Sequence, residues 1–406
     1  MSSEWPIHPL GELTINHDGK RRPVKESERK PGPYPYYGAS GIVDHVDGYL
    51  FDGSYLLIGE DGENMRTRQT PIAFMAHGKF WVNNHAHIVT GNHLADTRFL
   101  MYSVANTDIH SYLTGAVMPK LTQGNLNKIL LACPPLDVQR GIVGVLGALD
   151  DRITLLRETN ATLEAIAQAL FKSWFVDFDP VRAKLEGRTP EGMIDATAAL
   201  FPDGFEESEL GLVPRGWRVG TLGDIAQTIR QQLQPADLHM DINYVGLEHI
   251  PRKSLSLVSW GTADGLESAK ATFSEGDILF GKLRPYFHKV VVAPFDGVCS
   301  TDILVCQAKK PTYYGFVVMQ LFSTTLIEYA ERLSNGAKMP RVGWKDIAAY
   351  PVVIPSEPVV GAYTKAIEPL LARMKANVHA VQTLVTLRDT LLPRLISGQL
   401  RLPISA

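Results

Sequence analysis

Two short polar clusters in the chain carry residue types that could hold a metal ion. Glu60-Asp61-Gly62-Glu63 offers carboxylates, which hard cations prefer, and His85 and His87 would lie on the same face of a strand. The first cluster also has the composition of a polar turn. Because no third ligand follows the histidines at matched spacing, we predict no metal and no cofactor. The histidines are then core residues or lie close to DNA.

The sequence lacks the motifs of enzymes that act on DNA. A DNA methyltransferase needs an Asn/Asp-Pro-Pro-aromatic loop, and the nearest fragment, Asp179-Pro180-Val181, lacks the second proline and the aromatic residue. A translocase needs the phosphate-binding pattern Gly-x-x-x-x-Gly-Lys-Ser/Thr, which is also missing. We therefore predict no catalytic residues.

Basic residues interleaved with aromatic ones indicate DNA contact, because Lys and Arg bind phosphates while other side chains read base edges. Any single cation could equally be a solvated surface charge. In the first half of the chain the candidates are Lys20, Arg21, Arg22, Tyr34, Tyr36, Tyr37, Arg66, Arg68, Lys79 and Lys120. In the second half they are Arg230, Arg252, Lys253, Lys282, Arg284, Tyr286, His288, Lys289 and Arg341.

The overall composition is that of a soluble globular protein with two or three domains: 406 residues, 45% hydrophobic and 20% charged. A net charge of −3 is unusual for a DNA-binding protein, but acidic residues gather between Asp177 and Glu209, which leaves basic faces possible elsewhere.

The rest of the composition predicts a cytoplasmic protein. We expect no membrane span and no signal peptide, because no run of eighteen apolar residues occurs and the first ten residues are polar and contain two prolines. The cysteines Cys133, Cys299 and Cys306 show no metal-type spacing and predict buried free thiols in a reducing compartment.

The chain contains an internal repeat. Trp5…Leu10-Gly11 returns as Trp217…Leu222-Gly223, a shift of 212 residues, and Gly115-Ala-Val-Met-Pro-Lys120 returns as Gly336-Ala-Lys-Met-Pro-Arg341, a shift of 221. The second shift then persists without a gap to the end of each copy. Each copy begins with a mixed part that contains short strand-like runs and ends in a long helix.

The two helices show a strict seven-residue repeat of apolar positions, which predicts a coiled-coil seam. The alternative is that each helix packs on its own domain, although about 33 residues would span about 50 Å. In the first copy the seam is Ile142, Leu146, Leu149, Ile153, Leu156, Asn160, Leu163, Ala167, Leu170 and Trp174. In the second copy it is Tyr363, Ile367, Leu370, Met374, Asn377, Val381, Leu384, Arg388, Leu391 and Leu395.

These patterns predict an α+β fold in which two mixed α/β recognition domains are separated by two long helices that form an antiparallel coiled coil, with an internal pseudo-two-fold repeat. Such a pair would place the domains at opposite ends. Arg388 departs from the apolar seam and suggests an open end or a contact with another protein. The predicted parts are domain 1 (1–136), helix 1 (137–178), an acidic linker (179–214), domain 2 (215–357) and helix 2 (358–400).

The repeated segments resemble type I restriction–modification specificity subunits. The likeness rests on the domain starts and the Met-Pro segments quoted above. It also rests on Trp174-Phe-Val-Asp-Phe-Asp179-Pro-Val-Arg182, Gly187-Arg-Thr-Pro-Glu-Gly192, Leu200-Phe-Pro-Asp-Gly204 and Leu391-Leu-Pro-Arg-Leu-Ile-Ser-Gly398.

The resemblance implies a non-catalytic subunit that reads a bipartite site on double-stranded DNA. It further implies docking of two methyltransferase subunits through the helices and central region, and of motor–nuclease subunits through that complex. The predicted partner contacts are Trp174, Phe175, Phe178, Arg388 and Arg394.

Two other functions remain open from the residues alone. The chain could be a scaffold whose coiled coil and end domains bind proteins, or a dimeric transcription regulator, although no helix-turn-helix pattern occurs. A steep fall of duplex binding with salt would favour phosphate contacts over the scaffold.

Overall fold

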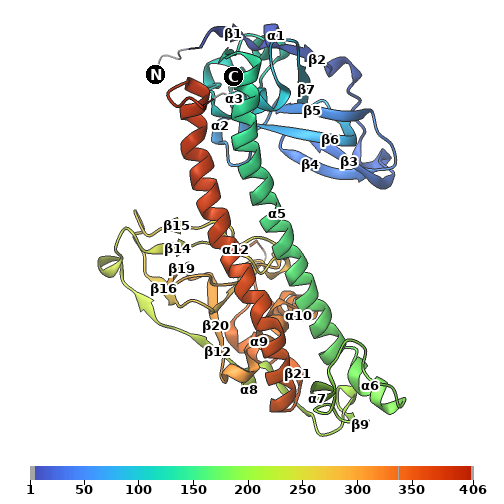
Figure 1. Cartoon of the computed structure of the whole chain (residues 1–406). Helices are drawn as coiled ribbons and strands as arrows, with labels where there is room; N and C mark the ends of the chain where they lie inside the picture. Colours follow the sequence, from blue (N-terminus) through green and yellow to red (C-terminus); the bar gives the residue numbers. More distant parts are fainter. Residues whose placement is uncertain (1–4, 337, 404–406) are drawn as a thin grey trace. The chain divides into compact units, whose positions relative to one another are not determined.

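The computed structural model describes residues 5–336 and 338–403, so residues 1–4 of the first predicted domain and Ala337 of the second Met-Pro segment lie outside the described residues. The chain divides into two compact units. The first unit comprises residues 1–152 and 384–406, and the second comprises residues 153–383. Two long helices, α5 (Leu136–Phe175) and α12 (Glu357–Ser397), contribute residues to both units (Figure 1).

The first unit is built on a six-stranded sheet with the order β2-β7-β5-β6-β3-β4. Its central strand β5 has Leu56, Leu57 and Ile58 fully buried, because apolar cores cover both faces of the sheet. The elements are β1 (Ile7–Pro9), α1 (Leu10–Leu13), β2 (Thr14–Asn16), β3 (Pro31–Gly38), β4 (Gly41–Val46), β5 (Phe51–Gly59), α2 (Asn64–Thr67), β6 (Ala73–Val82), β7 (Ala86–Gly91), α3 (Thr97–Asn106), α4 (Gln123–Leu126) and β8 (Leu130–Ala132).

The second unit contains a four-stranded sheet, β12-β20-β17-β18, and a five-stranded sheet, β13-β16-β19-β14-β15. Its strands are β9 (Phe205–Ser208), β10 (Gly211–Pro214), β11 (Arg218–Thr221), β12 (Ala226–Ile229), β13 (Gln232–Leu233), β14 (Asn243–Val245), β15 (Gly261–Thr262), β16 (Lys270–Phe273), β17 (Ile278–Gly281), β18 (Val290–Val292), β19 (Gly297–Cys299), β20 (Ile303–Ala308) and β21 (Pro351–Ile354). Its shorter helices are α6 (Asp179–Leu185), α7 (Asp195–Ala198), α8 (Leu222–Ile225), α9 (Tyr314–Phe322), α10 (Thr324–Leu333) and α11 (Trp344–Ala348).

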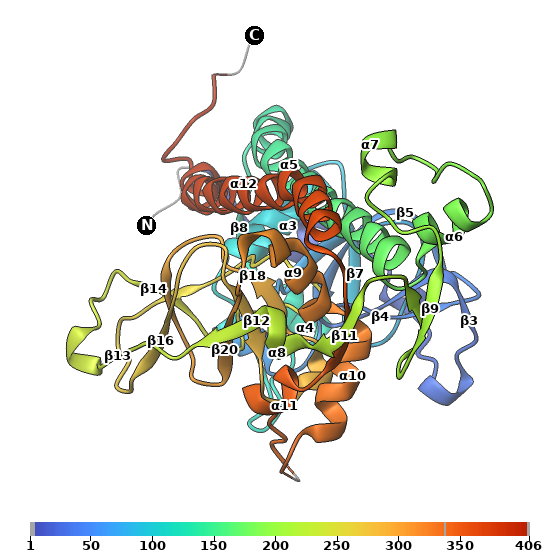
Figure 2. The same cartoon turned by 90° about the horizontal axis from the view of Figure 1, so that it is seen from below.

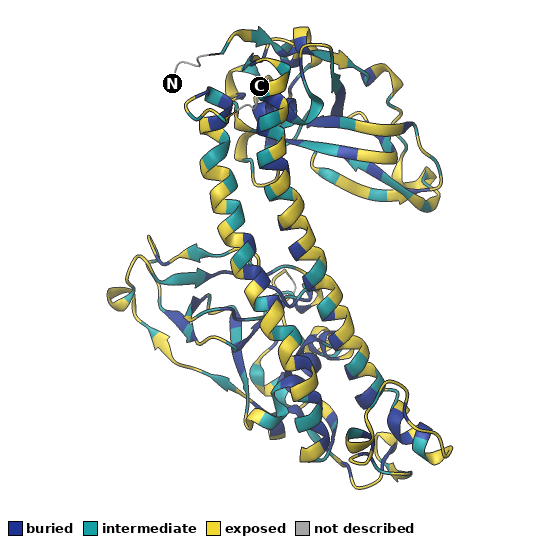
Figure 3. Cartoon of the chain, viewed as in Figure 1, coloured by how far each residue is buried: buried dark blue, intermediate teal, exposed yellow. Residues whose placement is uncertain are grey.

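The long helices pack against each other in an antiparallel sense, and the predicted α+β fold with two paired long helices is confirmed. In the second unit the Tyr363 hydroxyl of α12 donates to the carbonyl of Ala167 of α5 at 2.9 Å. Figure 2 shows α9 of this unit next to α12. In the first unit Ile142 and Leu146 of α5 pack with residues near the opposite end of α12. Buried and exposed residues alternate along both helices (Figure 3), as a narrow apolar stripe requires.

The seam asparagines form a buried polar contact in the second unit. The Asn377 amide donates to Asn160 Oδ1 at 2.8 Å, and the Asn160 amide donates to Ser256 Oγ and to the carbonyl of Met374, both at 3.1 Å. Both asparagines are buried. Because an unsatisfied buried amide is costly, this arrangement favours one register of the two helices and links α5 to the segment around Ser256.

Arg388 does not mark an open end of the helix pair. Its guanidinium binds Asp150 of α5 at 2.9 Å and also pairs with the adjacent Asp389. Asp150 in turn accepts a hydrogen bond from the hydroxyl of Tyr102 in α3. The seam therefore accommodates this cation through an ion pair with the facing helix.

The segment 179–214, which we predicted as an acidic linker, is folded onto the second unit. It contains α6, α7 and the antiparallel β9–β10 hairpin. Val181, Phe201 and Val213 are buried from this segment, and the Phe201 and Trp174 rings meet edge to face at 5.1 Å. Its acidic side chains lie on a packed subdomain and not on a free tether.

The cysteines and the helices bear on two further expectations from the composition. All three cysteines are buried and unpaired, as predicted, and burial raises the pKa of the Cys299 thiol to about 12. Within the described residues, no helix is both long and apolar enough to cross a membrane.

Candidate DNA-binding interface

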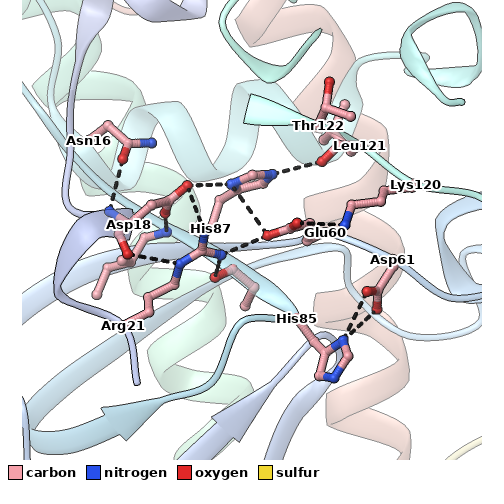
Figure 4. A network of polar contacts seen from close by, with 12 residues as sticks. Asn16, Asp18, Arg21, Glu60, Asp61, His85, His87, Lys120, Leu121 and Thr122 are labelled. Carbon is pink, nitrogen blue, oxygen red and sulfur yellow. Dashed lines mark hydrogen bonds and ion pairs between the residues drawn. The ribbon is translucent and has the colours of Figure 1, made fainter. Parts of the chain in front are cut away.

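In the first unit, two predicted DNA contacts belong to an internal polar network (Figure 4). Arg21 binds Glu60 at 2.7 Å and Asp18 at 3.3 Å, and Lys120 binds the other oxygen of Glu60 at 3.2 Å. Arg21 is largely buried, whereas the Lys120 side chain is half exposed. Because both cations already face carboxylates, they have less charge to offer a phosphate than a solvated lysine has.

The two histidines of the predicted polar cluster have different environments. His87 is buried, with Nδ1 at 2.6 Å from Asp18 and Nε2 at 2.8 Å from the carbonyl of Leu121, whereas His85 is exposed and faces Asp61 at 2.8 Å. Among the described residues, no group of three or more His, Cys, Asp or Glu side chains is arranged to hold a metal.

The acids of this network keep their charge in spite of burial. Burial by itself raises the pKa of Asp18, but hydrogen bonds from His87 and from the Ile88 N–H, together with the charge of Arg21, hold that pKa below its usual value. Burial also raises the pKa of Glu60, but the hydrogen bond from Arg21 lowers it, and the pKa of Glu60 lies below its usual value as well. The network is therefore a charged scaffold within the domain.

An exposed cluster of aromatic and basic side chains lies where β3, β6 and the turn before β5 meet. The Lys79 ammonium stands 4.8 Å from the centre of the Tyr49 ring, and the Tyr34 ring lies 5.1 Å from the same ring. Tyr49 was not predicted; its position after Gly48 in a turn that leads into a strand was the available signal. Base stacking and phosphate contact both suit such a surface.

The remaining candidates of the first unit differ in exposure. Lys20 and Arg22 are exposed, Tyr37 is half-buried, and Tyr36 is buried, so the prediction that Tyr36 contacts DNA is wrong for this conformation. The Tyr36 ring packs under Arg29, and its hydroxyl accepts from the N–H of Val24.

Arg66 and Arg68 are used within the first unit. Arg66 donates to the carbonyls of Gly115 and Ala116 at 3.0 and 3.3 Å and pairs with Glu63. Arg68 donates to the carbonyls of Ala105 and Thr107. Both guanidiniums thereby hold loops of the domain in place.

In the second unit, the predicted basic stretch forms a strained turn. Arg284 and His288 flank the 3-10 turn Pro285–Phe287 and both have φ near +50°, as does Lys253, whose N–H donates to the carbonyl of His288 at 2.9 Å. Non-glycine residues rarely adopt this conformation, and such strain is often found at functional sites. The turn carries the exposed Tyr286.

Side chains around this turn present two cations at the surface. The Arg252 guanidinium stacks 3.9 Å from the centre of the Phe287 ring, next to the exposed Lys253. Lys289 instead donates to the carbonyl of Leu247, and burial lowers its pKa. His288 is buried, with Nε2 at 2.8 Å from the carbonyl of Phe322. Phe287 was not predicted, although it follows Tyr286 directly.

A hollow of about 460 Å³ brings three further predicted cations of the second unit together. Its lining includes Arg230, Lys282 and Arg341, with the indole of Trp344. Arg341 forms a two-point ion pair with Asp302, with contacts of 2.9 and 3.2 Å. The charge of Lys282 also acts on Asp302, so this one acid offsets part of the positive charge around the hollow.

Two of the predicted partner contacts are core residues. Trp174 and Phe175 are 7% and 8% exposed, and both pack on Tyr363 in the core of the second unit. The prediction that they bind a partner is therefore wrong for this conformation, because their large rings close the apolar core instead. Phe178 is half-buried against Phe205 and Trp217, and Arg394 is exposed on α12.

The comparisons with known proteins agree with this architecture. Residues 2–165 match the family described as the type I restriction modification DNA specificity domain. Over 146 residues the chain is 41% identical to a protein of Haemophilus influenzae assigned as a type I restriction enzyme specificity subunit, a match that covers 36% of this chain and 37% of that protein.

Two further similarities extend over nearly the whole chain. The specificity subunit of the type I restriction enzyme EcoDI of Escherichia coli is 26% identical over 98% of this chain and 89% of its own length. The crystal structure of the S subunit of a type I restriction–modification system from M. genitalium superposes with a TM-score of 0.59 at 13% identity, over 97% of this chain and 96% of that one. Residues 2–165 thus match the type I restriction modification DNA specificity domain family, and the chain is similar over nearly its whole length to specificity subunits of type I restriction enzymes.

Proposed function

We propose that this chain selects the DNA sequence for a type I restriction–modification complex by reading a bipartite site on double-stranded DNA, one half-site with each recognition domain. The observation that carries the proposal is that each unit presents its own surface of cations and aromatic rings on a different sheet framework. In the first unit Tyr34 and Lys79 lie on the six-stranded sheet beside Tyr49 of the turn before β5. In the second unit the turn before β18 carries Tyr286, and Arg252 stacks on Phe287 of that turn. Different surfaces are expected to read different sequences.

The phosphate contacts are assigned to cations that take part in none of the close ion pairs in the described part of the chain. Lys79 and Lys282 feel the charges of Asp52 and Asp302, but no close internal ion pair must break before any of these cations binds a phosphate. They are Lys20, Arg22, Lys79, Arg230, Arg252, Lys253 and Lys282. Lys120, Arg341, Arg66 and Arg284 contribute to DNA binding through the loops that they hold.

The helices supply the docking surface for two methyltransferase subunits, through which the motor–nuclease subunits join. Leu155 and Ile166 of α5 and Leu387 of α12 are exposed aliphatic residues on helices that are otherwise polar on their outer faces. Exposed apolar side chains of this kind suit a helix–helix contact with another protein. In the proposal Phe178 of the second unit and Arg394 of the first unit are further docking contacts.

A domain exchange tests the two-reader proposal. Residues 5–134 are replaced by the first recognition domain of a relative with a different site, and the methylated bases are mapped in cells that carry the complete system. We expect one half of the methylated site to change and the other half to stay the same. A change in both halves would contradict the assignment of one half-site to each domain.

A further inference from the structure

Both recognition domains contain a three-stranded framework with the same strand order and register. In the first unit it is β2-β7-β5, and in the second it is β12-β20-β17. Gly59 at the end of β5 pairs with Ala86, and Gly281 at the end of β17 pairs with Ile303. These pairs match positions near the strand ends of one unit with positions of the other.

One matched position carries opposite charges in the two units. The residue after β5 is Glu60, and its N–H donates to the carbonyl of His85 at 2.9 Å. The residue after β17 is Lys282, and its N–H donates to the carbonyl of Asp302 at 3.0 Å. A glutamate of the first unit therefore has a lysine as its counterpart in the second.

A second matched position shows the same inversion of charge. The 212-residue shift of the repeat matches Asp18 with Arg230. The strand register agrees, because Asn16 and Thr228, two residues earlier in each copy, pair with matched positions of β7 and β20. An aspartate of the first unit therefore has an arginine as its counterpart in the second.

In the first unit, a side chain of the same domain lies between the two acids. The Arg21 guanidinium binds Asp18 and Glu60 and donates to the carbonyl of Ala86 at 2.8 Å (Figure 4). Arg21 is largely buried. The first unit thus satisfies this place internally, with a cation between two carboxylates.

In the second unit, the counterparts of these residues line the hollow of about 460 Å³. Arg230, Lys282 and Ile303 all belong to its lining. The same 212-residue shift matches Arg21 with Leu233, which carries no charge and belongs to β13 of the other sheet. The second unit therefore has cations where the first has acids, and an uncharged residue where the first has the arginine.

The charges of this hollow are complementary to an anion. Among the described residues that line it, none is acidic, and Arg230, Lys282 and Arg341 are basic. Asp302 stands behind this lining and already forms the two-point ion pair with Arg341. A guanidinium and an ammonium are then left to bind the several oxygens of an anionic group.

We propose that the hollow binds a backbone phosphate of the second half-site, whereas the first recognition domain holds its own Arg21 at the matched place. The chain runs from Lys282 directly into the turn that carries Tyr286, which we assign to the DNA surface. On that surface DNA offers a phosphate next to every base. This inference rests on the proposed function and adds that the two domains hold the DNA backbone unequally.

The test measures duplex binding by the full chain with its methyltransferase bound. For R230Q/K282Q we expect the slope of log K against log salt concentration to fall by about 0.9, the value for one phosphate, with the methylated motif unchanged. Lys282→Arg keeps the charge and should keep the native slope. Lys365→Gln, at an exposed position of α12 outside the lining of the hollow, is the matched control and should also keep it.

Duplexes that carry one uncharged methylphosphonate identify the phosphate. At one position of the second half-site, this change should weaken binding to the native protein by roughly tenfold. The same duplex should weaken binding to R230Q/K282Q no further, because the contact is already lost. In the first half-site, we expect no position to be coupled to these substitutions in this way.

Three results would overturn the inference and leave the proposed function intact. A changed motif with an unchanged salt slope would mean that the hollow reads bases. Loss of a methyltransferase subunit with native affinity for DNA would mean that the hollow binds a carboxylate of that partner. Native binding by the variant, shown by circular dichroism to be folded, would mean that the hollow contacts neither. If the unaltered chain with its methyltransferase fails to bind the duplex, the proposed function itself fails.

Discussion

At the scale of single residues, the cations of the recognition domains are of two kinds: some already pair with a carboxylate of their own domain, and others do not. Lys120 and Arg341 hold equivalent positions after a Met-Pro pair, and each faces a carboxylate inside its own domain. Lys253 is exposed and, within the described part of the chain, forms no ion pair. Because counterion release follows the charge that phosphates newly neutralise, these positions should affect DNA binding differently.

This difference can be measured as a salt slope. For Lys253→Gln we expect the slope of log K against log salt concentration to fall by about 0.9, the value for one phosphate contact. For Arg341→Gln the change should be smaller, because the native side chain already pairs with Asp302 at 2.9 Å. Duplex binding at several salt concentrations, with the methyltransferase bound, provides the measurement. Equal changes in slope would show that the internal ion pair opens on DNA.

At the scale of elements, a buried carboxylate joins α5 to the second recognition domain. Glu164 accepts hydrogen bonds from the N–H of Leu255 at 2.7 Å and from Ser254 Oγ at 3.3 Å. Burial raises its pKa above the usual value, and the Leu255 hydrogen bond offsets only part of this effect. The folded protein therefore binds this proton more tightly than the unfolded chain does.

The raised pKa of Glu164 makes its contribution to the stability of the folded protein depend on pH. Stability from a group with a raised carboxyl pKa is present at low pH and is lost as the pH rises above the unfolded value of about 4.3 toward the folded pKa. Glu164→Gln removes this loss while it keeps a hydrogen-bond acceptor. We expect the variant to gain stability relative to the native protein as the pH rises from 4 to 8.

Urea unfolding followed by the fluorescence of Trp174 and Trp217, which both lie in the core of this unit, measures the effect. Glu158→Gln, on an exposed position of the same helix, is the matched control and should show no such trend. A constant difference across the pH range for Glu164→Gln would mean that its burial does not perturb folding.

At the scale of the whole molecule, both long helices are continuous from one compact unit into the other. Their contacts differ along the length: apolar packing with the Arg388–Asp150 ion pair in the first unit, and the Asn160–Asn377 contact with an aromatic cluster in the second. We propose that the helix length sets the gap between the two half-sites.

Insertion of seven residues in each helix, after Arg152 and after Thr383, tests this proposal. Seven residues keep both seams in phase and lengthen each helix by about 10 Å. At 3.4 Å per base pair the methylated site should widen by about 3 base pairs. Insertions of four residues, which put the seams out of phase, are the control and should disrupt the helix pair. An unchanged gap with intact methylation would rule out the helices as the spacer.

Several features of this protein could be predicted from the sequence alone: the repeat, the two long helices, the mixed domains and the resemblance to the family. They could be predicted because heptad spacing and Gly-x-x-Met-Pro segments are local patterns. Only the tertiary structure decided which of the predicted contact residues are exposed and free to bind DNA or a partner protein. Tyr36, Trp174 and Phe175 have the residue types of contact sites, yet they are buried. Lys120 and Arg341 are neutralised by Glu60 and Asp302, which lie far from them in sequence. Burial and ion pairing depend on distant neighbours, so a cation or an aromatic ring looks the same in the sequence whether it faces DNA or its own domain.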